Sequence, residues 1–176
     1  MAYITESMLL DYAQDIQKRQ QARSNIVLEK ASAQKTIFLS HSHKDKDLVE
    51  GLINYLASFG IKIYVDWNDT GMPRITNRDT AERIKEKIRE NSFFLILATE
   101  NAMSSRWVPW EIGVADQMKH ENIAIIPVIR NSDSEFKGNE YLQLYRCIQL
   151  DWFNDIKIFE IASASSRMNL KDWLNR

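Results

Sequence analysis

The amino-acid sequence predicts an α/β protein in which a parallel sheet of five strands is covered by helices on both faces. Short runs rich in β-branched and aromatic residues alternate with helical stretches, in the order β-α-β-α-β-α-β-α-β. Two runs, FFLILAT (93–99) and IAIIPVI (123–129), are apolar throughout, which is typical of strands buried on both faces. The length of 176 residues fits one domain with an appended segment.

Composition narrows the classes of function. Lys and Arg number 23 and Asp and Glu number 24, so the formal charge of -1 argues against a basic surface for nucleic acid or anionic membranes. No stretch approaches the ~18 apolar residues of a membrane helix. The first residues, MAYITESMLLDYAQ, lack the basic start of a signal peptide. The single cysteine, Cys147, allows no intrachain disulfide. We therefore expect a cytoplasmic protein without nucleic-acid or membrane partners.

Residues 3 to about 31 contain no Pro or Gly and are predicted to form a helix. Its short apolar stripe consists of Ile4, Met8, Leu9, Tyr12 and Ile16. The stripe fades into the polar, basic stretch QKRQQARS. Because such a helix needs packing to be stable, it either lies on the rest of the chain or acts as a self-association arm. The chain is thus divided into a helical arm at 1–34 and a domain at 35–176.

The elements of the domain follow from local patterns. Strands are predicted at 35–40, 61–65, 93–99, 123–129 and 147–152. Ser42 and Asp45 resemble a capping box before a helix of regularly spaced apolar residues, which Gly60 closes. Further helices are predicted around 81–88, within 101–120, near 156–165 and near 169–175. The segment 66–79 forms a long loop, often a functional feature in a compact domain. Trp152 and Trp173 are expected to be packing residues.

The predicted ligand site lies at the carboxyl ends of the strands, because parallel sheets bind ligands there. That edge collects 40–43, 66–78, 99–111 and the residues from 130 onward. The sequence contains no GxGxxG, GxxxxGK[ST] or GxSxG motif, which argues against a standard dinucleotide fold, a phosphate-loop NTPase and an α/β-hydrolase. His41, His43 and Asp45 are a weak metal pattern, and we expect no metal site.

The stretch SSRWVPWEIG (104–113) carries the most informative pattern. Pro109 has no N–H and suits the first turn of a helix, which would then begin near 105–108. Glu111 lies near the positive end of that helix and shares a face with Trp107, four residues earlier. An aromatic ring beside a carboxylate suits a flat, cationic ligand. The alternative is that Trp107 and Trp110 anchor the core while Glu111 only complements the helix dipole.

Three blocks in order, KTIFLSHSHKD, IKIYVDWND and IRENSFFLILATENAMSSRWVPWE, resemble a TIR (Toll/interleukin-1 receptor) domain of the bacterial, NAD-cleaving type. The resemblance runs from about Lys35 to about Trp152, and the long loop takes the place of the family's mobile BB loop. It implies a flavodoxin-like sheet. It also implies that Glu111 of the WxxxE motif is catalytic and that Trp107 stacks on the nicotinamide or another ring.

The resemblance implies an NAD+ glycohydrolase or cyclase that releases nicotinamide and ADP-ribose or a cyclic ADP-ribose, in anti-phage defence or signalling. NAD+ is then a substrate, and no cofactor is expected. The alternatives are a non-catalytic adaptor that acts by TIR–TIR assembly and a nucleoside deoxyribosyltransferase-like enzyme. The expected partners are further copies of the chain and a separate effector or sensor protein.

Other candidate substrate-binding residues lie at the same edge. They are Ser40, His41, Asp66, Trp67, Arg74 and Arg78. The first two could contact ribose or phosphate, or serve only the loop and its cap. The next two open the long loop, where the tryptophan could cover the site. The two arginines suit a pyrophosphate, or else lie on a solvated face of the loop.

Overall fold

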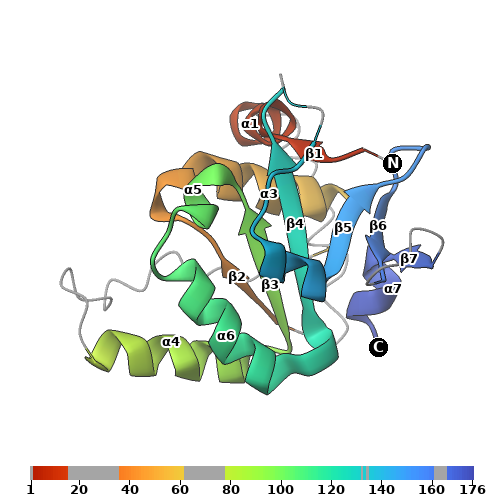
Figure 1. Cartoon of the computed structure of the whole chain (residues 1–176). Helices are drawn as coiled ribbons and strands as arrows, with labels where there is room; N and C mark the ends of the chain where they lie inside the picture. The colour runs from red at the N-terminus through yellow and green to blue at the C-terminus, as the bar shows by residue number, and fades with distance from the viewer. Residues whose placement is uncertain (1, 16–35, 62–77, 132, 134, 161–165) are drawn as a thin grey trace.

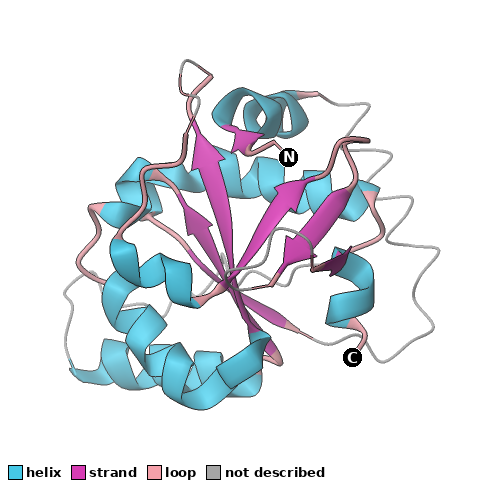
Figure 2. Cartoon of the chain, turned by 45° about the vertical axis from the view of Figure 1, so that its right-hand side comes forward, coloured by secondary structure: helices cyan, strands magenta, loops and turns pink. Residues whose placement is uncertain are grey.

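The computed structural model describes residues 2–15, 36–61, 78–131, 133, 135–160 and 166–176. These residues form one sheet with helices on both faces (Figures 1 and 2). Within them the sheet has seven strands, in the order β2-β3-β4-β5-β6-β7, and β1 pairs separately with β4. The predicted α/β class with a mainly parallel sheet is confirmed. The strand count differs from the predicted five, and β6 and β7 pair antiparallel.

The centre of the sheet is built from strands that the sequence predicts. They are β2 (Ile37–Ser40), β3 (Phe93–Ala98), β4 (Ile123–Ile129) and β5 (Arg146–Leu150). Each pairs in parallel with its neighbour. The predicted strand at 61–65 lies outside the described residues except for Ile61. Every residue of β3 is buried, as its unbroken apolar sequence predicts for a strand covered on both faces.

The helices divide between the two faces of the sheet (Figure 1). One face carries α1 (Glu6–Gln14) and α3 (Lys46–Ser58), and the other carries α4 (Arg78–Glu90), α5 (Glu100–Met103) and α6 (Val108–Lys119). Alternate residues of β3 therefore enter different cores, since Leu95 packs beneath α3 and Ile96 beneath α6. The described residues also form three short 3₁₀ helices: His43–Asp45, His120–Asn122 and Glu140–Leu144.

Helix α3 ends at Ser58, and Gly60 closes it two residues later, as predicted. Gly60 has a φ of 71°, its N–H donates to Ala57 O over 2.9 Å, and the N–H of Ile61 donates to Leu56 O over 3.0 Å. These bonds satisfy the last carbonyl groups of the helix, and the left-handed backbone suits glycine.

The N-terminal segment is part of the fold up to Asp15. Strand β1 (Ile4–Thr5) pairs in parallel with the end of β4, and Ala2 bridges to Leu150. Helix α1 then packs on α3, so the predicted packing of this segment on the domain is confirmed for these residues. The prediction of one helix from residue 3 is wrong at β1 and at Asp15, whose backbone is extended. Residues 16–35 lie outside the described residues, and the division at 34 stays a prediction.

The C-terminal part corrects one predicted helix. Residues Ile156–Phe159 form β6, antiparallel to β5, and Arg167–Asn169 form β7, antiparallel to β6. The helix predicted near 156–165 is wrong over β6, because Ile156 and Ile158 alternate into the core with the period of a strand. The last predicted helix is confirmed as α7 (Leu170–Leu174), and its Trp173 is buried against Phe93, as expected of a packing residue.

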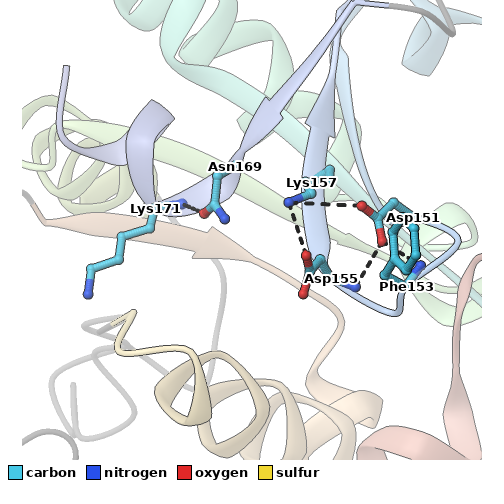
Figure 3. A network of polar contacts seen from close by, with 6 residues as sticks. All are labelled: Asp151, Phe153, Asp155, Lys157, Asn169 and Lys171. Carbon is cyan, nitrogen blue, oxygen red and sulfur yellow. Dashed lines mark hydrogen bonds and ion pairs between the residues drawn. The ribbon is translucent and has the colours of Figure 1, made fainter.

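The turn between β5 and β6 holds two aromatic side chains in solvent. Asp151 Oδ1 accepts hydrogen bonds from the backbone N–H groups of Phe153 and Asp155, over 2.8 and 3.1 Å. Its Oδ2 forms an ion pair with Lys157 Nζ, 3.9 Å away (Figure 3). Trp152 and Phe153 are 78% and 83% exposed. The prediction that Trp152 is a packing residue is therefore wrong, because this compact turn directs it outward.

The close approach of α1 to α3 makes Gly51 a sensitive position. A Cβ atom there would lie 1.9 Å from the carbonyl oxygen of Leu9 and 2.5 Å from its carbonyl carbon. Because both are backbone atoms, Gly51→Ala must push α1 away, and we expect a loss of about 1–3 kcal/mol in the free energy of unfolding. Urea unfolding followed by circular dichroism measures this loss.

Gly113→Ala in α6 is the matched control, because a Cβ atom there meets nothing within 4 Å. We expect it to stabilise the fold by about 0.4–1 kcal/mol through the unfolded state. Equal effects of the two substitutions would contradict the close packing of α1 on α3.

Candidate active site

The candidate site is centred on a buried hydrogen bond between Ser40 and Glu111. Ser40 Oγ donates to Glu111 Oε2 over 2.5 Å, and the two residues are only 1% and 9% exposed. Ser40 is the last residue of β2, and Glu111 lies in the first turn of α6. The pair therefore lies at the carboxyl end of a parallel strand, where the topology predicts a ligand site.

Glu111 owes its position to the start of α6. The helix begins at Val108, inside the predicted range, and Pro109 occupies its first turn. The N–H of Glu111 donates to Trp107 O over 2.8 Å and closes that turn. Val108, Ile112 and Ala115 are buried on the same helix, so Glu111 places a carboxyl group among otherwise apolar positions.

Burial changes the acidity of this carboxyl group. It raises the pKa of Glu111 to about 7, while the hydrogen bond from Ser40 acts in the opposite direction. The charged and neutral forms are then both populated near neutral pH. A carboxyl group poised in this way at a sheet edge is typical of a catalytic group.

Trp107 supplies an aromatic ring at the start of the same helix. The backbone N–H of Trp107 donates to Ser105 Oγ over 3.2 Å. The ring of Trp107 meets that of Trp110 edge to face, with centroids 5.2 Å apart. Both rings pack against the core beneath α6, as the packing alternative predicts. Trp107 is nevertheless only half-buried, so part of its surface is open to a ligand.

His41 follows Ser40, and its environment favours the neutral form of the imidazole. Its Nδ1–H donates to Leu39 O over 2.9 Å. Burial lowers the pKa of the imidazole below its usual 6.5, which outweighs the hydrogen bond to Leu39. His41 thus supplies a polar side chain next to the serine of the pair.

Asp45 departs from its predicted capping role. It is 2% exposed, its Oδ2 accepts from Thr99 Oγ1 over 2.5 Å, and its Oδ1 accepts from Asn101 Nδ2 over 2.6 Å. The side chain makes no capping bond to α3. Sequence reasoning missed this link because Ser42 and Asp45 offered a local explanation, whereas the partners lie more than fifty residues away.

The described residues do not test the other predicted contacts to a substrate. Asp66, Trp67 and Arg74 lie outside the described residues. Arg78 is the exposed first residue of α4. Lys85 lowers the pKa of Glu82 most, and the charge of Arg78 adds to this effect.

Across the described ranges, no group of three or more His, Cys, Asp or Glu residues could hold a metal ion. No helix in those ranges has the length and apolar character needed to cross a membrane.

The fold and site define an α/β domain with a buried carboxyl group and an aromatic ring at its ligand edge. The sequence model of the TIR domain family matches residues 37–158. A Bacillus cereus (strain MSX-D12) protein named "Probable 3' cyclic ADP-D-ribose synthase ThsB'" is 36% identical over 146 residues, covering 80% of this chain and 75% of that protein. The chain therefore belongs to the TIR domain family. A solved prokaryotic SEFIR domain aligns with a TM-score of 0.46 and 15% identity, over 68% of this chain and 89% of the other.

The buried carboxyl group predicts a pH-dependent effect of Glu111→Gln on stability. Because the pKa of Glu111 is higher in the folded than in the unfolded chain, the folded state loses stability as the pH rises from about 4.5 through about 7. Glutamine keeps an acceptor for Ser40 without the charge. We expect the variant to be more stable than the wild type by about 3 kcal/mol at pH 8 and by much less at pH 5.

Urea unfolding at both pH values measures the effect. The exposed Glu86 of α4 provides the control, since Glu86→Gln removes a solvated carboxylate and should change little. A gain in Glu111→Gln that is the same at pH 5 and pH 8 would contradict the raised pKa.

Proposed function

We propose that this chain cleaves NAD+ at the bond between nicotinamide and ribose. The observation that carries the proposal is the buried Ser40–Glu111 pair at the end of β2, because the glutamate belongs to the WxxxE motif and burial raises its pKa to about 7. The relative named as a cyclic ADP-ribose synthase supports the same substrate.

In the proposed reaction, the bond from ribose C1′ to the pyridinium nitrogen breaks through an oxocarbenium-like state. The bonding electron pair passes to the ring nitrogen, so nicotinamide leaves as a neutral molecule without a general acid. Ionised Glu111 would hold the ribose hydroxyl groups and offset the positive charge that develops. The half-buried ring of Trp107 would stack on a flat ring of the substrate.

The product depends on which nucleophile then attacks C1′. Water would give ADP-ribose and release its proton. A nucleophile of the same ADP-ribosyl group would give a cyclic ADP-ribose, also with loss of a proton. We favour the cyclic product, because the relative with 36% identity is named for one.

Several further roles belong to the same proposal. His41 would contact the ribose or a phosphate, since it follows Ser40 at the strand end. Contacts to the substrate from Asp66, Trp67, Arg74 and Arg78 remain proposals. We also propose that the chain works in the cytoplasm by TIR–TIR self-association, and that its product signals to a separate effector in bacterial defence. A non-catalytic adaptor has no use for a buried, costly carboxyl group, which favours the enzyme.

The direct test is NAD+ consumption by the concentrated wild-type chain, with a crowding agent to favour self-association. We expect nicotinamide release in the wild type and a loss of about 100-fold or more in Glu111→Ala, the scale on which single electrostatic groups act in active sites. Chromatography and mass spectrometry identify the second product, and a cyclic product has the mass of ADP-ribose less one water.

Glu86→Ala is the control, because it removes an exposed glutamate from α4 and should retain full activity. Equal NAD+ consumption by the wild type and Glu111→Ala would contradict the proposal. So would a wild-type chain that neither binds nor consumes NAD+ when it is self-associated.

A further inference from the structure

Asp45 uses both carboxyl oxygens to hold another loop. Oδ2 accepts from Thr99 Oγ1 over 2.5 Å and Oδ1 accepts from Asn101 Nδ2 over 2.6 Å. Thr99 Oγ1 in turn accepts the N–H of Ala102 over 3.0 Å, which caps α5. Asp45 therefore attaches the start of α5 to the loop that follows β2.

The same loop is attached to α6 at its other end. Ser40 begins it and donates to Glu111. The segment 104–107 joins α5 to α6. The loop that follows β2 therefore restrains the helix on each side of this segment, α5 through Asp45 and α6 through Ser40. Trp107 is the last residue of that segment. The bond at Ser40 and the two bonds at Asp45 therefore hold this segment, and with it Trp107, against the loop that follows β2.

Burying the Asp45 carboxyl group costs free energy, and helix capping does not explain why it is buried. A buried carboxyl group is expensive unless it is fully hydrogen-bonded, and an aspartate at this position could have capped α3 from the surface. Asp45 occupies the N-cap position of α3 but makes no side-chain capping bond to it. Its hydrogen bonds instead join two loops at the ligand edge.

We propose that Asp45 is a positioning residue for NAD+ binding, because it fixes the segment that carries Trp107 against the loop that carries Ser40 and His41. This inference rests on the proposed function. Asp45 acts through Trp107 and does not itself touch the substrate. The Ser40–Glu111 bond does not involve Asp45, so the inference concerns binding more than the chemical step.

The test compares steady-state constants for NAD+ cleavage. We expect Asp45→Ala to raise KM by about tenfold or more, on the scale of losing hydrogen bonds to a charged group, and to lower kcat far less. Asn101→Ala removes one of the two bonds and should raise KM less. Thr99→Ser keeps the hydroxyl group, and with it both the bond to Asp45 and the cap of α5, so it should resemble the wild type.

Asp151→Ala is the matched control for a structural effect. Asp151 is also an aspartate, 6% exposed, and it also accepts two hydrogen bonds, but in the β5–β6 turn (Figure 3). We expect it to lower Tm about as much as Asp45→Ala while leaving KM unchanged. All variants are assayed below the temperature at which circular dichroism first detects unfolding.

The outcomes separate this inference from the proposed function. An active wild type beside a folded Asp45→Ala with unchanged KM overturns the positioning role alone. Equal increases in KM for Asp45→Ala and Asp151→Ala also overturn it, because the effect would then follow stability. A wild-type chain that neither binds nor cleaves NAD+ overturns the proposed function and this inference together.

Discussion

Burial of the Glu111 carboxyl group against Ser40 is the constraint on which the site depends. It requires β2 to end at Ser40 and α6 to begin just before Glu111, so that donor and acceptor meet over 2.5 Å. Removing an ionisable group from water costs free energy, and that cost appears as the raised pKa of Glu111. Because its pKa is raised, the carboxyl group can gain or lose a proton near neutral pH, whereas an exposed glutamate stays ionised there.

The rest of the fold holds the two elements that meet in this bond. Strand β2 is fixed by its parallel pairing with β3, whose alternate residues fill two separate cores. Helix α6 is fixed by the apolar face that surrounds Glu111. Asp45 adds a link from the loop after β2 to the start of α5. The site thus combines residues from two stretches, 40–45 and 99–111, which lie more than fifty residues apart in sequence.

Local patterns predicted much of this architecture, and long-range contacts account for what they missed. Pro109 and Gly60 mark helix ends through backbone chemistry, so the start of α6 and the end of α3 were predictable. Strand β1 was not, because its two residues are defined only by pairing with β4. Glu111 and Trp107 stood out by spacing and by resemblance to TIR domains. The partners of Asp45 could not be inferred, since a closer capping explanation competed with a contact more than fifty residues away.

The most direct measurement of the central claim is the pH dependence of kcat/KM for NAD+ in the wild type and in Ser40→Ala. If ionised Glu111 supports bond cleavage, kcat/KM rises with pH and levels off above an apparent pKa of about 7. Ser40→Ala should move this rise to higher pH, because it removes the hydrogen bond that lowers the pKa of Glu111. A rise centred near 4.5, the usual range of an exposed glutamate, or a profile unchanged in Ser40→Ala, would contradict the account.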